Sequence, residues 1–302
     1  MLSKSLFFCL IILILSLIAV SDALATGMSV NMGIELLQQV PPGESYLLNP
    51  VLIIYNKSDK ASTFVLSAVK PSTGLGTTLG YFDLPELNWI TFEKNQIKIP
   101  PNGNDSVRVY LSIPKEDKYY NQHWSVYISV AAGAGGGNIS LACYPKILIE
   151  TENKLSPKEK NNNLLGLEPS VVKFENVQSD YKKPVKRIKI YNNSDKKQVY
   201  SISVLESKSC VEKRIFRTSG YSWMPDSNWI KLYTGKRPSV RSAPFSISVD
   251  ANKSYSLQLK LNLSKDEQYK RWEGIILVES DQGFSNFARV FIEPDSTGKD
   301  VK

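Results

Sequence analysis

The feature that most constrains this chain is an eleven-residue stretch that it contains twice. Residues 80–90 read Gly-Tyr-Phe-Asp-Leu-Pro-Glu-Leu-Asn-Trp-Ile, and residues 220–230 repeat the Gly-Tyr, the Pro and the Asn-Trp-Ile at the same spacing. Six of the eleven positions are identical. Self-similarity at a long period indicates a duplicated structural unit, and 302 residues suffice for two domains of ordinary size. We therefore expect two copies of one fold.

Two further patterns recur in the same order. An Ile-Tyr-Asn-x-Ser-Asp-Lys turn stands between β-prone runs at residues 54–60 and again at 190–196. Apolar and polar residues then alternate strictly over 107–113 and 257–263, which is typical of a strand with one face on a core. No convincing amphipathic helix is found. The predicted fold is all-β, with two tandem immunoglobulin-like antiparallel β-sandwiches.

Composition changes along the chain predict the domain boundaries. Lys4, an apolar run from Leu6 to Val20 and an Ala-Leu-Ala at 23–25 are typical of a cleaved signal peptide, and an uncleaved membrane anchor is the alternative. The predicted segments are a signal peptide (1–25), a first sandwich (26–150), a polar linker (151–164), a second sandwich (165–294) and a disordered tail (295–302).

Charge is divided unevenly between the copies. Residues 26–150 carry 9 Lys and Arg against 10 Asp and Glu, whereas residues 151–302 carry 27 against 18. The basic second copy predicts either an anionic partner, such as envelope polymer or lipid headgroups, or a solvated lysine-rich surface. Nucleic acid would also suit the charge, but predicted export argues against it. Direct membrane contact is expected only through an uncleaved signal segment.

Residues that could carry catalysis are sparse. The single histidine, His123, is expected to be a surface neighbour of a core tryptophan, because the second copy has Arg271 at this place. Cys143 and Cys210 lie at different places in the two copies and are expected to be separate thiols, with an interdomain disulfide as the alternative. One histidine and two distant cysteines do not predict a metal site. We expect no enzyme activity and no cofactor.

A basic and aromatic loop in the second copy is the candidate binding surface. Such a mixture suits an anionic carbohydrate or a protein partner, and the alternative is an insertion that covers one end of a sandwich. The candidate binding residues are Lys208, Lys213, Arg214, Phe216, Arg217, Tyr221 and Trp223.

The repeated motif itself is interpreted as framework. Trp89 and Trp229 each precede a strand, and each is followed by a second tryptophan later in the same copy. This order is expected of buried residues that tie a long loop to a sandwich. The predicted framework anchors are Tyr81, Trp89, Trp124, Tyr221, Trp229 and Trp272.

The order of these motifs, together with Pro-Pro-Asn-Gly at 100–103 and Val-x-Val-x-Leu-x-Ile-Pro at 107–114, resembles bacterial envelope immunoglobulin-like domains. It is similar to the peptidoglycan-binding domain of WxL-interacting proteins and more distantly to PapD-like and major-sperm-protein-like sandwiches. The resemblance implies an exported, non-enzymatic envelope protein, periplasmic or at the cell surface, that binds envelope polymer or a protein partner. The alternative is a periplasmic chaperone of PapD type that presents an edge strand to a client.

Overall fold

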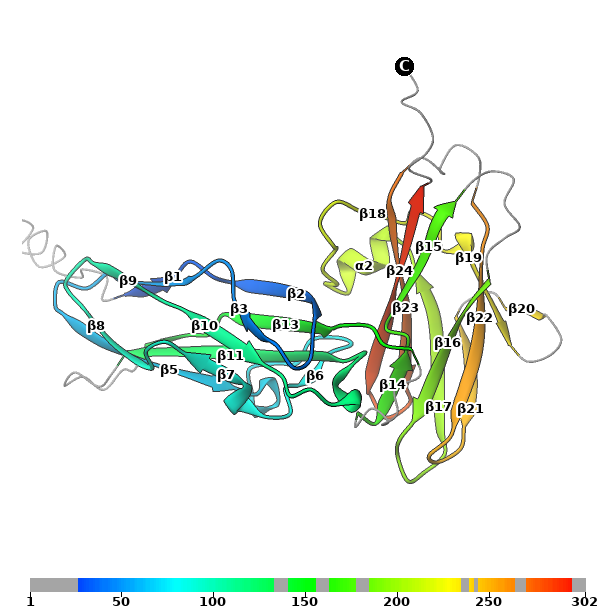
Figure 1. Cartoon of the computed structure of the whole chain (residues 1–302), viewed down its shortest axis with the longest axis horizontal. Helices are drawn as coiled ribbons and strands as arrows, with labels where there is room; N and C mark the ends of the chain where they lie inside the picture. The colour runs from blue at the N-terminus through cyan, green and yellow to red at the C-terminus, as the bar shows by residue number, and fades with distance from the viewer. Residues whose placement is uncertain are drawn as a thin grey trace, which may run out of the picture.

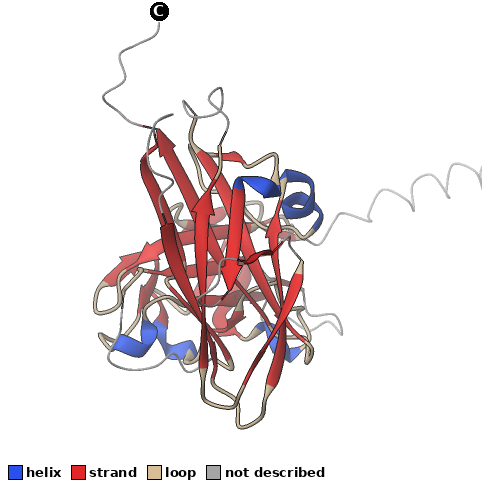
Figure 2. Ribbon diagram, turned by 90° about the vertical axis from the view of Figure 1, so that its right-hand side faces the viewer, coloured by secondary structure: helices blue, strands red, loops and turns tan. Residues whose placement is uncertain are grey.

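The computed structural model describes residues 27–132, 141–155, 163–177, 185–234, 239–241, 244–263 and 270–294. The predicted signal peptide, the predicted tail and residues 156–162 of the predicted linker lie outside these ranges. The described chain forms two sandwiches, seen side by side in Figure 1, and its short helices lie at their margins (Figure 2). The predicted fold class, two tandem immunoglobulin-like β-sandwiches, is confirmed.

The first sandwich is built from thirteen described strands. They are β1 (Met28–Val30), β2 (Ile34–Val40), β3 (Ser45–Leu47), β4 (Leu52–Asn56), β5 (Ser62–Val69), β6 (Phe82–Asp83), β7 (Ile90–Phe92), β8 (Gln96–Ile99), β9 (Asn104–Val107), β10 (Val109–Ser112), β11 (His123–Ala132), β12 (Ala142–Cys143) and β13 (Lys146–Thr151). One layer has the order β2-β13-β11-β5-β8, and β6 and β12 also pair with β11. The other layer consists of the sheets β1-β4-β9 and β3-β10-β7.

The second sandwich repeats this plan with eleven described strands. They are β14 (Leu165–Glu168), β15 (Val171–Val177), β16 (Val185–Asn192), β17 (Gln198–Leu205), β18 (Ser222–Trp223), β19 (Ile230–Thr234), β20 (Ser239–Arg241), β21 (Phe245–Val249), β22 (Ser254–Leu261), β23 (Trp272–Ser280) and β24 (Ser285–Pro294). Its layers are β14-β16-β22-β19-β20 and β15-β24-β23-β17-β21, with β18 beside β23. In both sandwiches an early strand pairs in parallel with the last one, β2 with β13 and β15 with β24.

Short helices occupy the connections. They are η1 (Pro71–Thr73), η2 (Leu87–Trp89), η3 (Asp117–Tyr119), α2 (Ser207–Glu212) and η4 (Ser227–Trp229). The equivalent helices η2 and η4 contain the Asn-Trp pairs of the repeated motif. The six-residue helix α2 corrects the sequence-based expectation of strands and loops alone, and it is too short for its apolar periodicity to be recognised.

Each sandwich has its own apolar core. Trp89 contacts Trp124 in the first copy, with ring centroids 5.6 Å apart, and Trp229 contacts Trp272 in the second at 5.3 Å. All four tryptophans are buried in the two cores. A third apolar cluster contains residues of both sandwiches and lies between them.

The repeated Asn-x-Ser turns use one hydrogen-bonding scheme in both copies. The side-chain amide of buried Asn56 donates to three main-chain carbonyls at 2.8 to 3.2 Å. Asn192 does the same at 2.7 to 3.2 Å. Each asparagine side chain thus ties its own turn to the loop before the alternating segment. A residue that favours a local turn therefore also stabilises a contact between segments that are distant in the sequence.

The alternating segment differs between the copies. In the second it forms the single strand β22, as the pattern predicts. In the first it is interrupted at Arg108, so that β9 pairs with β4, whereas β10 pairs with β3 and β7. The apolar residues of both parts still face the core. Side-chain alternation therefore predicts which face is buried but not which strand is the partner.

Candidate functional site

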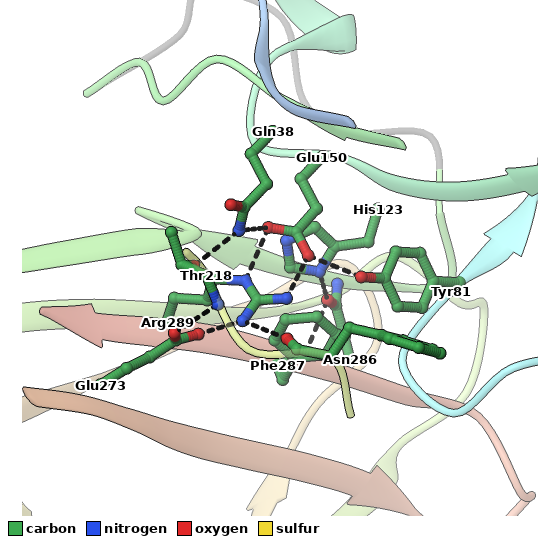
Figure 3. A network of polar contacts seen from close by, with 10 residues as sticks. Gln38, Tyr81, His123, Glu150, Thr218, Glu273, Asn286, Phe287 and Arg289 are labelled. Carbon is green, nitrogen blue, oxygen red and sulfur yellow. Dashed lines mark hydrogen bonds and ion pairs between the residues drawn. The ribbon is translucent and has the colours of Figure 1, made fainter. Parts of the chain in front are cut away.

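A buried ion network joins the two sandwiches (Figure 3). Arg289 of β24 donates from Nε and Nη2 to the two carboxylate oxygens of Glu150, at the end of β13, over 2.7 and 2.6 Å. Its Nη1 donates to Glu273 of β23 and, at 3.0 Å, to the carbonyl of Phe216. The side chains of Arg289, Glu150 and Glu273 are at most 2% exposed. All three charged groups are therefore held by one another rather than by water.

Neutral side chains complete the network. The Tyr81 hydroxyl donates to Glu150 at 2.5 Å. The Gln38 amide donates to Glu150 at 3.1 Å and to the Thr218 hydroxyl at 2.9 Å, and the Thr218 main-chain N–H donates to Glu273 at 2.7 Å. Because Gln38 and Thr218 belong to different sandwiches, this chain of bonds crosses the interface a second time.

An apolar shell surrounds the ions. Leu148 and Tyr81 of the first sandwich pack with Ile275, Leu277 and Phe287 of the second in one buried cluster. The rings of Tyr81 and Phe287 meet edge to face with centroids 5.5 Å apart. Low-dielectric surroundings strengthen the paired charges and make an unpaired charge costly.

His123 lies in the same interface, which corrects the expectation that it is a surface residue. It is 1% exposed, its ring stacks on Phe287 with centroids 4.2 Å apart, and its Nδ1 lies 3.1 Å from the Asn286 amide oxygen. Because both contacts come from the other sandwich, they could not be inferred from the neighbouring Trp124. Burial lowers the pKa of His123 to about 4, with Glu150 opposing this in part. The imidazole is therefore neutral near pH 7 and donates from Nδ1.

The shared guanidinium affects its two carboxylates differently. Burial alone raises the pKa of Glu150, but the Arg289 charge and hydrogen bonds outweigh burial and lower it to about 2. Burial also raises the pKa of Glu273, and there Arg289 and Thr218 offset it only in part. Burial lowers the pKa of Arg289, and Glu150 outweighs burial, so that it is raised overall. Arg289 thus favours the ionised form of Glu150 strongly and offsets the effect of burial on Glu273 only in part.

The buried network forms a rigid connection between the two sandwiches, and we call it the joint. It consists of Gln38, Tyr81, Glu150, Thr218, Glu273 and Arg289. Each charged group points into the interface, and the polar contacts come from β2, β11, β13, β23 and β24 together (Figure 3). Hydrogen bonds of fixed geometry and an apolar shell both oppose rotation of one sandwich against the other. The joint thus holds the two sandwiches in a defined relation.

A sheet edge at the end of the first sandwich remote from the joint has no outer hydrogen-bonded strand among the described residues. The first strand runs beside β4 as β1, crosses between the layers at residues 31–33, and pairs with β13 as β2. The Asn31 side chain holds the crossing by donating to the Val51 carbonyl and accepting from the Ile53 N–H. Pairing with the last strand starts where the Lys146 N–H donates to the Gly33 carbonyl at 2.8 Å. Among the described strands, the segment before Lys146 pairs by hydrogen bonds with β11 alone, and β1 lies close to it without pairing.

Hydrogen-bond alternation shows which groups face outward along this edge. The Ala132 N–H donates to the Leu141 carbonyl, and the Ile128 N–H donates to the Pro145 carbonyl, both at 2.9 Å. In an antiparallel pair every second residue bonds its neighbour, so Ala142 and Tyr144 direct their main-chain groups away from β11. Leu141 is 40% exposed and Tyr144 43%. The edge thus offers both ladder hydrogen bonds and apolar surface.

The seven candidate binding residues differ in their exposure and in their partners. Lys208 pairs with Glu212 of the same helix, and Lys213 lies 3.7 Å from Glu279. Lys208, Lys213, Arg214, Phe216 and Arg217 are exposed, and Tyr221 and Trp223 are half-buried. This segment is anchored by buried Cys210 and Ile215, which pack in the interface cluster. Since the Phe216 carbonyl also accepts from Arg289, the loop supports the joint from outside.

The six predicted framework anchors have unequal surroundings. The four tryptophans lie in the cores described above. Tyr81 bonds Glu150 in the joint, whereas Tyr221 is half-buried, bonds Glu293 and packs on Phe291 with centroids 4.6 Å apart. The repeated tyrosine therefore donates to a glutamate of its own copy in both sandwiches. The Tyr81–Glu150 pair of the first copy lies in the interface and also binds Arg289 of the other sandwich.

Several sequence-based expectations concern groups outside the joint. Cys143 and Cys210 are both free, as expected. Within the described ranges, no cluster of three or more His, Cys, Asp or Glu side chains is suited to a metal ion. The helices of the described chain are all too short or too polar to cross a membrane.

Comparison with known proteins returns similar folds only. No family model and no curated protein matches the chain. A solved PapD-like domain of human CEP192 is 10% identical with a TM-score of 0.34, over 43% of this chain and 89% of that one. A protein of unknown function from Porphyromonas gingivalis W83 is 10% identical (TM-score 0.33; 88% and 99% covered). The class 5 fimbriae chaperone CfaA is 14% identical (TM-score 0.32; 87% and 99% covered). At such low scores the similarity is one of coarse architecture.

Proposed function

We propose that the protein is exported and non-enzymatic, and that it binds an extended segment of a client protein by strand addition along the edge of residues 141–145. Such binding adds one strand to a sheet, with main-chain hydrogen bonds for affinity and side-chain pockets for specificity. The signal-like N-terminus supports export. Of the two functions that the sequence predicts, this is the chaperone-like alternative, and the other is an envelope scaffold that binds envelope polymer or a protein partner.

The observation that carries the proposal is the outward direction of the main-chain groups of Ala142 and Tyr144. Exposed edges of this kind invite pairing with another chain. The edge exists because the first strand crosses to the other layer at Asn31, so it is built into the fold. The buried state of His123 and of the joint carboxylates also supports a binding role rather than catalysis.

A strand-forming peptide provides the first test. The probe is a fluorescent decapeptide of alternating Val and Thr, and the control peptide has the same length with Pro at two central positions, which removes ladder donors. Fluorescence anisotropy with the mature chain from Thr26 measures both. We expect saturable binding of the alternating peptide and little binding of the proline peptide. Equal binding of the two would refute strand addition.

Variants at the edge localise the binding. Ala142→Pro removes one outward N–H and leaves the bonds to β11, whereas Ala142→Ser keeps that N–H and is the matched control. Loss of one ladder bond predicts about fivefold weaker binding for the proline variant alone, from roughly 1 kcal/mol. Leu141→Ser tests the apolar contribution in a variant with no proline, and circular dichroism verifies folding. Normal binding by folded Ala142→Pro and Leu141→Ser would place the peptide elsewhere.

A further inference from the structure

The second sandwich has a basic sheet face that the proposed client site does not use. It is the outer face of the sheet containing β16, β22 and β19, whose inner side carries buried Ile188, Leu259 and Leu232. In Figure 1 these strands lie on the side of the second sandwich away from the first. Because residues alternate between faces, the outward positions are set by the register of these three strands.

Cations occupy adjacent outward positions on all three strands. Lys231 of β19 lies directly opposite Lys260 of β22, which in turn lies opposite Val185 of β16. Two residues further along β16, Arg187 lies opposite Gln258. The positive charges therefore form a two-dimensional array on a sheet whose strands are about 4.8 Å apart.

Among the described residues, few groups on this face neutralise the array. The Lys231 ammonium donates to the Asn228 side-chain oxygen at 3.0 Å, and the Lys260 ammonium lies 4.8 Å from the Tyr233 ring centroid. No ion pair within the described residues involves Arg187, Lys231 or Lys260. Like charges placed directly opposite each other on a sheet destabilise it. An anionic partner would remove this cost.

We propose that this face docks on the surface of an anionic lipid bilayer. The cations spread over three strands instead of following one line, which matches a plane of headgroups better than a linear polymer. Val185, 46% exposed, and the half-buried Tyr233 lie among them and add apolar and amphipathic contacts of the kind found at membrane interfaces. Each lysine near such a surface contributes about fivefold in affinity, from about 1 kcal/mol.

Vesicle co-flotation tests the proposal. The mature chain from Thr26 is mixed with vesicles of phosphatidylglycerol and phosphatidylcholine, or of phosphatidylcholine alone, at low and at high salt. We expect retention only by the anionic vesicles, weakening with salt. The double variant Lys231→Gln/Lys260→Gln should bind about 25-fold more weakly. The matched control Lys94→Gln/Lys98→Gln removes two exposed lysines of the first sandwich, outside this face, and should bind normally.

The remaining outcomes overturn the proposal. Equal losses in both double variants would show that only net charge matters. Retention unchanged in Lys231→Gln/Lys260→Gln, or absent in the unmodified chain, would exclude this face as a membrane site. Binding of soluble polyphosphate without binding of vesicles would assign the face to a linear polyanion. Peptide binding at the β12 edge should be unaffected by these variants, so the two proposals fail independently.

Discussion

Gly80 and Gly220 occupy the same place in the repeated motif, and replacing each by alanine separates the stability of the joint from that of the turn. Both glycines have positive φ, 79° and 83°. An L-residue in this left-handed region costs about 1 to 2 kcal/mol. A Cβ on Gly220 would meet nothing within 4 Å, whereas one on Gly80 would lie 2.3 Å from Cδ1 of Phe287 in the other sandwich.

The second cost applies only at Gly80. Carbon atoms in contact are normally 3.5 to 4.0 Å apart, so the Phe287 ring would have to move by about 1 Å or more. That ring is fully buried and stacks on His123, and such overpacking costs about 1 to 3 kcal/mol. Gly220→Ala should therefore lose about 1 to 2 kcal/mol of unfolding free energy, and Gly80→Ala about 2 to 5 kcal/mol.

Urea unfolding of the mature chain, monitored by tryptophan fluorescence, measures both losses. Adding Phe287→Leu tests the mechanism, because a smaller side chain should accommodate the new methyl group. The loss in Gly80→Ala/Phe287→Leu should then be smaller than the sum of the single losses. Equal losses for Gly80→Ala and Gly220→Ala, or strict additivity with Phe287→Leu, would refute the close approach of the two sandwiches at this point.

Three further predictions concern buried polar groups. Arg289→Met leaves Glu150 buried without its counter-charge and should cost about 3 to 5 kcal/mol in calorimetry, whereas the exposed Arg187→Met should cost little; a small loss at Arg289 would contradict the described joint. The pKa of His123 is lowered by burial to about 4, so its contribution to stability is complete above about pH 6.5 and is lost as the pH falls towards 4. His123→Phe should remove that part of the pH dependence of the unfolding free energy, and an unchanged slope would exclude His123 as its source. Asn192→Ala removes the donor to three carbonyls and should lower the unfolding free energy by about 1 to 3 kcal/mol, measured by urea unfolding. Asn192→Asp also lacks this donor, so little change in that variant would mean that another group replaces it.

Much of the fold could be predicted because its signals are local and occur twice. The alternating segments indicated a buried face, and the Asn56 and Asn192 turns indicated chain reversals. Repetition gave each pattern an independent second instance. The interruption of the first alternating strand at Arg108 was not predictable in this way, because it depends on which distant strands compete for its two halves.

The joint could not be predicted, although the sequence contains a trace of it. Glu273 and Arg289 each stand between uncharged residues in a mainly apolar run, at positions where Ser125 and Lys146 stand in the first copy. Ionisable residues are seldom fully buried unless they are paired. Such positions indicate that a partner exists, but only the three-dimensional structure identifies it as Glu150 of the other sandwich.

The two copies use the same Tyr–Glu pair in different ways. Trp124 and Trp272 are equivalent and lie opposite Ile149 and Ile292, so the following residues, Glu150 and Glu293, are equivalent too. Each accepts a hydrogen bond from the repeated tyrosine. In the first copy the residue before the tryptophan is neutral His123, and the cation beside the carboxylate is Arg289 of the other sandwich. In the second copy this place is taken by Arg271 of the same sandwich. Burial raises the pKa of Tyr221, and the Arg271 charge partly opposes this rise. The position before the tryptophan therefore holds a buried neutral ring in the copy whose Tyr–Glu pair lies in the interface, and an exposed cation in the copy whose pair does not bind the other sandwich.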